Sequence, residues 1–298
     1  MLYNQPNMPK LKIAFILFSA ICIVSFAAIL IKLAGEASAL VIATYRLTLA
    51  TLLLAPLVLL QSRRELLSLS KKEWLLSLLS GAFLSLHFFT WVSSLKYTSV
   101  ASSVVLVTTN PIFIGLGSYF LLKERLRALL VAGIGLSVTG GILIGYGDFR
   151  VGNDVLLGDL LALTGAIMAS GYFLIGRRVR QKLALLPYIF IVYGMAALIL
   201  LGLSLLTHQQ FFGYSRSTYF WLVLMAVGPQ LIGHTSVNWA LKYVSAATVA
   251  VAILGEPVGS TILAYLILKE GLTPLKLVGG LLILLGIYMA ARAETMKK

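Results

Sequence analysis

Long apolar runs dominate this sequence and leave it few ways to fold. A helix that crosses a bilayer needs about 20 apolar residues, and ten stretches of the chain meet that need, with short gaps between them. These predicted spans are residues 11–31, 40–60, 74–95, 99–122, 126–146, 156–175, 185–206, 219–241, 246–268 and 275–291. In lipid, helices bond all their backbone polar groups internally. The sequence therefore predicts an all-α integral membrane protein with ten transmembrane helices.

The composition excludes other classes of protein. Of the 298 residues, 59% are hydrophobic and only 11% are charged, far from the composition of a soluble domain. The net charge of +14 would suit a nucleic-acid partner only if the basic residues shared one face or arm, and here they fall in short clusters between apolar runs. The single cysteine, Cys22, allows no intramolecular disulfide. The first run is too long for a signal-peptide core, so we interpret it as a retained span.

Lysines and arginines predict the orientation. Cytoplasmic loops carry an excess of these residues, and alternate loops of this chain hold most of them. The predicted inner residues are Lys10, Lys12, Arg63, Arg64, Lys71, Lys72, Lys123, Arg125, Arg127, Arg177, Arg178, Arg180, Lys182, Lys242, Arg292, Lys297 and Lys298, against Lys32, Lys96, Arg150, Arg216, Lys269 and Lys276 outside. We therefore expect a multi-pass protein of the cell (inner or plasma) membrane with both termini in the cytoplasm.

Two segments of the chain repeat each other. Residues 97–126 align without a gap with residues 243–272. The identical pairs include Tyr97/Tyr243, Ser99/Ser245, Ala101/Ala247, Pro111/Pro257, Tyr119/Tyr265 and Lys123-Glu124/Lys269-Glu270. A chance alignment of two apolar helices would share leucine, valine and alanine, but not proline, tyrosine and a Lys-Glu pair at fixed spacing. The sequence predicts two five-helix repeats, residues 1–147 and 148–298, joined near the polar segment 147–154.

An odd number of spans in each repeat inverts the second repeat relative to the first. Inverted repeats are typical of secondary transporters, whose substrate sites lie between the repeats near the bilayer midplane. The sequence has no GxxxxGK[ST] phosphate loop, no HExxH and no GxSxG, so neither an ATPase nor an enzyme is indicated. We expect a carrier that works by alternating access with no cofactor and no metal. A facilitative pore or channel for small solutes is the alternative.

Several motifs together resemble a known family. They are the prolines in the middle of spans four and nine, the KE at the ends of these spans in LLKERL and LILKEGL, the stretch GDLLALTGAIMASGYFLIGRR, and the glycines Gly133, Gly140, Gly279 and Gly286. Their order and duplication resemble the EamA branch of the drug/metabolite transporter superfamily over essentially the whole chain. The resemblance implies an exporter or exchanger of small organic metabolites such as amino acids, or of cationic drugs. It also implies a central cavity lined mainly by spans one, three, four, six, eight and nine.

A carboxylate lies in the middle of span nine, in the stretch LGEP that contains Glu256 and Pro257. An ionisable side chain inside a membrane is costly and marks an ion or proton path. The proline breaks the helical hydrogen bonding, and the first repeat has Asn110 and Pro111 at the equivalent place. Glu256 is therefore our leading candidate for binding solute and, because apolar surroundings favour a neutral carboxyl group, for carrying a proton. The alternative is a structural carboxylate paired with Arg46 or a histidine.

Two histidines occupy equivalent places in spans three and eight. Residues four apart share a helix face, which groups His87 with Trp91, and His234 with Gln230 and Asn238. Facing lipid, these polar groups would lack hydrogen-bond partners. We expect them to face the cavity or to bond across helices.

Arg46 is a permanently charged group within span two. It could extend toward the headgroups, or anchor a carboxylate of the solute or of Glu256. Gly141 and Gly145 form a GxxxG pattern that we attribute to packing within the chain, so we expect a monomer or a weak homodimer. The expected residues of the substrate or proton cavity are Glu256, His87, His234, Asn238, Gln230, Asn110, Trp91 and Arg46.

Overall fold

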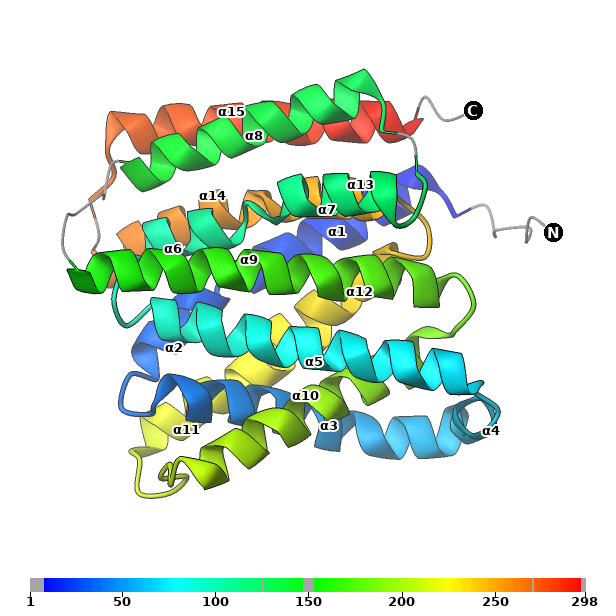
Figure 1. The fold of residues 1–298 in the computed structure, drawn as a ribbon. Helices are drawn as coiled ribbons and strands as arrows, with labels where there is room; N and C mark the ends of the chain where they lie inside the picture. The colour runs from blue at the N-terminus through cyan, green and yellow to red at the C-terminus, as the bar shows by residue number, and fades with distance from the viewer. Residues whose placement is uncertain (1–7, 125, 147–152, 270, 296–298) are drawn as a thin grey trace.

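A computed structural model of the chain describes residues 8–124, 126–146, 153–269 and 271–295. All the regular elements in these ranges are helices, which run side by side along one direction (Figure 1). They are α1 (Lys10–Val24), α2 (Ala27–Leu33), α3 (Ala39–Gln61), α4 (Arg63–Leu67), α5 (Lys71–Ser94), α6 (Val100–Val107), α7 (Asn110–Phe120), α8 (Ala128–Tyr146), α9 (Asn153–Arg180), α10 (Leu185–Leu206), α11 (Arg216–Met225), η1 (Ala226–His234), α12 (Thr235–Ala240), α13 (Ala246–Ile253), α14 (Gly255–Leu263), η2 (Ala264–Leu268) and α15 (Pro274–Thr295).

The expectation of an all-α membrane protein is confirmed. Within the described ranges, 9 helical stretches are long and apolar enough to cross a membrane, judged by length and composition. The remaining predicted span, 126–146, corresponds to α8, whose apolar part Ala128–Ile144 is shorter. The predicted junction of the repeats at 147 and 148 lies outside the described residues, as do Arg125, Arg150, Glu270, Lys297 and Lys298.

Serine side chains fix where several of these helices begin. Ser99 and Ser245 are repeat equivalents, and each accepts a hydrogen bond from the backbone N–H three residues on, at 3.1 and 3.2 Å. Ser38, Ser70 and Ser215 cap α3, α5 and α11 in the same way. A side-chain cap of this kind stabilises a helix by about 1 kcal/mol. The two halves thus start equivalent helices with the same local interaction.

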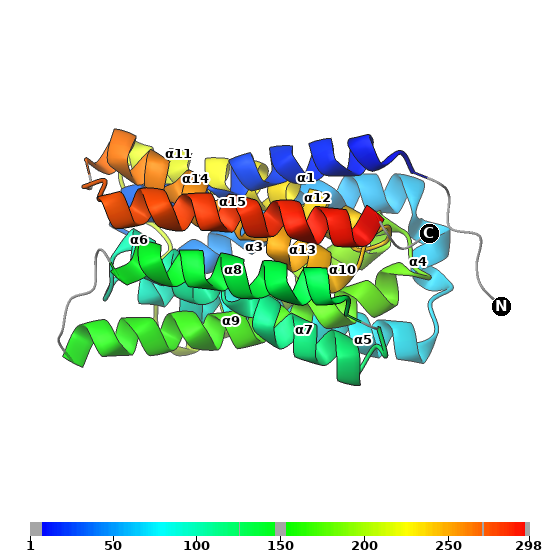
Figure 2. The same cartoon turned by 90° about the horizontal axis from the view of Figure 1, so that it is seen from above.

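The two halves meet along α8 and α15, which both views show side by side (Figures 1 and 2). A Cβ atom on Gly133 would lie 2.8 Å from the carbonyl oxygen of Gly286, and one on Gly140 would lie 2.5 Å from that of Gly279. Between these contacts Ser137 Oγ donates to the carbonyl of Ile283 at 3.3 Å. The order of the contacts makes the two helices antiparallel, and only glycine allows their backbones to approach so closely.

These contacts have the form of a two-fold interface. Gly133 is the repeat equivalent of Gly279, and Gly140 is the equivalent of Gly286. Gly133 meets Gly286, the equivalent of Gly140, and Gly140 meets Gly279, the equivalent of Gly133. Such exchanged pairs are the rule for a two-fold interface, in which both partners use the same surface. This is the packing that inverted repeats give where they join. It also accounts for the glycine-rich sequence of α8 by packing within the chain.

The ends of the bundle differ in charge. Helix α1 begins and α15 ends on the same side (Figure 1, right). Three basic clusters lie at that end, after α7, in the last turn of α9 and in α4. Lys32, Lys96 and Arg216 lie at the opposite end. The bundle therefore separates the two predicted groups of basic loops, and the compartment that each end faces stays a prediction.

Candidate functional site

Two broken helices place an amide and a carboxylate at the middle of the bundle. Helix α6 ends at Val107 and α7 begins at Asn110, while α13 ends at Ile253 and α14 begins at Gly255. The prolines at 111 and 257 stand in the first turns of the new helices, where the missing N–H of proline costs no hydrogen bond. Asn110 and Glu256 are 4% and 9% exposed. The predicted breaks therefore occur in both repeats, and the breaks position these two side chains.

Both side chains line a central cavity of about 540 Å³, a volume that includes its opening. The lining residues come from α1, α2, α5, α6, α7, α9, η1, α12, α13 and α14, which belong to spans one, three, four, six, eight and nine. Five of the eight expected residues line it, namely Glu256, His87, His234, Asn110 and Trp91. Gln230, Asn238 and Arg46 lie outside the lining.

Aromatic rings form one wall of the cavity. The rings of His87 and Trp91 stack with centroids 5.9 Å apart and planes 10° apart. The ring of Phe88 meets that of His234 edge-on, with centroids 5.3 Å apart. An aromatic wall beside a carboxylate can hold a cation through the ring faces as well as through the charge.

The two histidines have different partners. His87 Nδ1 donates to the carbonyl oxygen of Gly165 at 2.9 Å, which links α5 to α9. The same nitrogen of His234 is buried and has no hydrogen-bond partner in the described part of the chain. His87 is therefore held by the fold, whereas Nδ1 of His234 has no such anchor among the described residues.

Arg46 does not extend toward the headgroups, because its side chain is 0% exposed. Its guanidinium carbon lies 4.1 Å from the centre of the Phe88 ring, and its Nε donates to Gln230 Oε1 at 2.8 Å. The two terminal nitrogens have no partner among the described residues. A buried cation with so few partners is costly, so this charge is a strong local source of positive potential.

Glu256 forms neither a hydrogen bond nor an ion pair with the described residues. Arg46 is close enough for an electrostatic interaction between the two charges, but they make no ion pair within 4.0 Å. The alternative of a Glu256 already neutralised by Arg46 or a histidine is therefore not what this structure contains. The carboxylate faces the cavity and has no hydrogen-bond or ion-pair partner in the part of the chain that the structure describes.

The remaining expected residues support the cavity from behind. Gln230 lies in η1, a π-helical stretch that contains Pro229, and its side chain is fully buried against Arg46. Asn238 Nδ2 donates to the hydroxyl of Tyr172 and, at 2.8 Å, to the carbonyl of His234. Tyr172 lines the cavity. These amides thus orient cavity residues instead of forming the wall themselves.

Sequence reasoning missed part of the lining. Tyr172, Phe173 and Thr108 face the cavity from the sixth and fourth spans. The ring of Phe88 contacts both Arg46 and His234, which only the three-dimensional structure reveals. Tyr172 could have been found, because a tyrosine in the middle of a span needs a hydrogen-bond partner. Phe173 and Phe88 carry no such signal, since phenylalanine is common throughout apolar helices.

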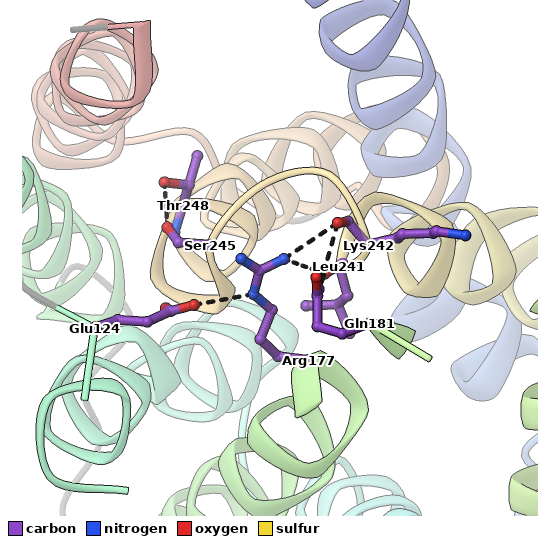
Figure 3. A network of polar contacts seen from close by, with 7 residues as sticks. All are labelled: Glu124, Arg177, Gln181, Leu241, Lys242, Ser245 and Thr248. Atoms are coloured by element: carbon purple, nitrogen blue, oxygen red, sulfur yellow. Dashed lines mark hydrogen bonds and ion pairs between the residues drawn. The ribbon is translucent and has the colours of Figure 1, made fainter. Parts of the chain in front are cut away.

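A polar network links the two halves of the chain at the basic end of the bundle (Figure 3). Arg177 of α9 donates from Nε to Glu124 Oε1 at 3.0 Å and from Nη1 to the carbonyl of Leu241 at 2.7 Å. Gln181 Nε2 donates to the same carbonyl at 3.3 Å. One guanidinium therefore joins the end of α7, in the first half, to α9 and the end of α12, in the second half.

The opposite end has a related contact. Lys32 Nζ at the end of α2 donates to the carbonyl of Leu95, and Leu95 is the repeat equivalent of Leu241. Lys32 ends the first span of its half, and Arg177 ends the first span of the other half. Each contacts a carbonyl at the end of the third span of its own half, where the helix dipole favours a cation. Lys96 Nζ adds a contact to the carbonyl of Ala37 at 3.2 Å.

Comparison with known proteins identifies the family of the chain. Residues 11–146 and 156–292 each match the EamA-like transporter family. An uncharacterized transporter of Clostridium kluyveri is 27% identical over 199 residues, 65% of this chain and 64% of the relative, so the chain matches less than two thirds of that protein. An uncharacterized transporter of Archaeoglobus fulgidus is 25% identical over 85% of this chain and 88% of its own length.

A solved structure supports the fold. A protein known from a crystal structure superimposes with a TM-score of 0.77, covering 96% of this chain and 99% of the other at 22% identity. Two family matches, one in each half, account for the duplicated motifs and the helix order. The chain is a multi-pass membrane transporter and belongs to the EamA-like transporter family.

Proposed function

We propose that the protein is a secondary transporter, an exporter or exchanger, that moves small organic solutes by alternating access around the central cavity. The observation that carries this proposal is the cavity itself, lined by Glu256 and Asn110 at the breaks of equivalent helices. Transporters bind substrate at such discontinuous helices near the midplane. The two units that rock around the solute are the inverted repeats, residues 1–147 and 148–298.

The charges of the site favour a solute with an amino group. Glu256 is the carboxylate of the cavity lining, and Trp91 and Tyr172 line the same space. An ammonium group would gain both a charge partner and aromatic faces. Arg46, behind Phe88, supplies the opposite charge nearby. Arg46 lies outside the lining, so it would favour the carboxylate of a small amino acid through its positive potential rather than by contact.

Glu256 also supports proton coupling. It faces the cavity, and no described residue bonds to its carboxylate. Apolar surroundings favour the neutral form of a carboxyl group, so a proton and a cationic solute would compete for the same oxygen atoms. If the variant Glu256→Gln transports with the pH dependence of the wild type, coupling through this residue is wrong.

Two alternatives make different use of the same cavity. An exporter of cationic drugs would rely on Glu256 and the aromatic wall without Arg46. A facilitative pore would need the cavity to be open at both ends at once, which the network around Arg177 and the contact between Lys32 and Leu95 oppose. These contacts favour a carrier over a pore.

Counterflow in liposomes tests the proposal. The purified protein is reconstituted, loaded with an unlabelled solute from a panel of small amino acids and organic cations, and exposed to the same solute in labelled form. A carrier accumulates label transiently because solute inside accelerates the return step. Flux without such trans-stimulation would indicate a pore, and chemical change of the solute would indicate an enzyme.

A further inference from the structure

A second pocket lies at the basic end of the bundle, between the end of α7 and the end of α9. Its empty space is about 830 Å³ with open solvent included, and Leu121, Leu122, Lys123, Glu124, Arg177, Arg178 and Gln181 line it. It is separate from the central cavity, with which it shares no lining residue. Three basic residues line it, namely Lys123, Arg177 and Arg178. The excess of lysine and arginine in cytoplasmic loops accounts for their side of the membrane but not for their place in a pocket.

The pocket has an excess of positive charge. Arg177 is paired with Glu124 at 3.0 Å, so these two charges cancel. Lys123 and Arg178 are exposed, and neither makes a hydrogen bond or an ion pair in the described ranges. Lys123, three residues after the end of α7, has a φ of 55°, a left-handed conformation typical of residues that follow helix ends. Two unpaired cations therefore face one space beside a neutral pair.

The surface next to this pocket is apolar. Leu116, Tyr119, Phe120 and Leu121, on and just after α7, are 55%, 57%, 69% and 69% exposed. In a membrane protein such side chains lie in the hydrocarbon region, with tyrosine near its boundary. The structure thus joins a basic pocket at the helix ends to an apolar surface that runs down α7. A ligand that fits both has a negative head and an apolar tail.

We propose that this pocket binds the phosphate of an anionic phospholipid from the surrounding leaflet, with the phosphate between Lys123 and Arg178 and the acyl chains along α7. Basic pockets between transmembrane helices bind anionic headgroups in this way. A soluble anion would use the cations but gain nothing from the apolar surface. The phosphate would lie beside the Arg177–Glu124 pair, whose two charges cancel each other.

Lipid retention measured by native mass spectrometry tests the proposal. The full chain, purified in detergent, is mixed with dioleoyl phosphatidylglycerol or with dioleoyl phosphatidylcholine. We expect the wild type to retain one phosphatidylglycerol at least about tenfold more tightly than phosphatidylcholine. The double variant Lys123→Gln/Arg178→Gln should weaken phosphatidylglycerol binding about 25-fold, since each surface cation contributes to the attraction.

A matched variant controls for net charge. Arg63→Gln/Arg64→Gln removes two exposed cations from α4, at the same end of the bundle but outside the pocket, and should leave the preference unchanged. Gel filtration and circular dichroism verify folding, and if the double variant aggregates, the single variants should each lose about fivefold.

Three outcomes would overturn the lipid site. One is equal binding of the two lipids by the wild type, and another is equal loss in both double variants. The third is displacement of phosphatidylglycerol by free glycerol phosphate at similar concentration, which would indicate a site for soluble anions. Because the readout is lipid binding, its result does not depend on which solute the central cavity takes.

Discussion

The two halves of the chain share one plan but differ at their centres. The first half has Asn110 at its helix break and the second has Glu256, and both line the same cavity. In transporters built from inverted repeats, substrate sites lie at the interface of the repeats, and alternating access is largely motion of one repeat against the other. The carboxylate of Glu256, at one of the two equivalent positions, gives the lining of the shared cavity a negative charge. The helix break is present in both halves all the same. The comparison teaches that the fold is duplicated while the chemistry is concentrated in the second half.

Spans three and eight extend this contrast. Helix α5 is a regular α-helix in which His87 bonds to Gly165. Its counterpart is divided into α11, η1 and α12, with Pro229 in the π-helical part. A ring nitrogen of His234 in η1 has no hydrogen-bond partner within the described ranges. Such π-helical stretches are frequent at functional sites. The second half therefore carries both the carboxylate and the more irregular backbone.

Removing the charge difference between the halves should have the largest effect on transport. Replacing Glu256 by Gln removes the carboxylate from the cavity lining, and the loss of one member of a desolvated charge pair costs about 2–5 kcal/mol. We expect counterflow of the preferred solute to fall at least about 30-fold. Asn110→Ala is the matched change in the first half and should cost less than about tenfold. Equal losses in the two variants would remove the proposed asymmetry.

The contacts at the two ends should have the next largest effect. Arg177→Gln removes charge-assisted hydrogen bonds to Glu124 and Leu241, each worth about 1.5–3 kcal/mol. It should expose the cavity to the basic end, whereas Lys32→Gln should expose it to the other. The measurement is the labelling rate of Val107→Cys by an impermeant maleimide from each side, with Cys22 replaced by Ser. If both variants increase labelling from the same side of the membrane, the two contacts do not control access from opposite ends.

The seam between the halves gives a smaller effect, on stability. In Gly140→Ala the new methyl group would lie 2.5 Å from the carbonyl oxygen of Gly279, and overpacking of this kind costs about 1–3 kcal/mol. Gly135→Ala, on the same helix, meets nothing within 4 Å and should keep or slightly raise the thermal unfolding temperature in detergent. A Gly140→Ala variant as stable as Gly135→Ala would argue against close contact of α8 with α15.

The smallest effect concerns pH at the end that carries fewer basic residues. Hydrogen bonds from the backbone and side chain of Ser215 hold the pKa of Glu36 below its usual value of 4.5. Because the folded pKa is the lower one, the contact stabilises this end above pH 4.5 and is lost as the pH falls through the lowered value. In that acid range the Ser215 amide should lose protection, measured as its exchange rate relative to that of an unstructured amide at the same pH. Glu36→Gln should abolish this pH dependence, and an unchanged profile would contradict the assignment.

The sequence predicted the architecture well because apolar length and repetition are local signals. Span limits, helix breaks at Pro111 and Pro257, and the pairing of related segments could all be read from residue types. The break between α1 and α2 could not, since the residues around Ser25 carry no proline or glycine to mark it. Packing against the rest of the bundle decides such positions.

The candidate site was predictable only in part, for the same reason. Glu256 and His87 stand out because polar groups are expensive in apolar helices. The sequence spacing predicts that Gln230 and His234 share one helix face. Because η1 is π-helical, Gln230 contacts Arg46 while His234 lines the cavity. Whether Arg46 reaches Glu256 depends on the position of Phe88, which no periodicity reveals.

Moving the charge between the halves tests the central claim most directly. On the background of Glu256→Gln, the substitution Asn110→Asp returns a carboxylate to the equivalent position of the first half, in the same cavity. Counterflow of the solute preferred by the wild type is measured in liposomes for both variants. If the halves are interchangeable around one shared site, the double variant recovers a clear part of the transport lost by Glu256→Gln. A folded double variant that transports no better than Glu256→Gln would contradict that account.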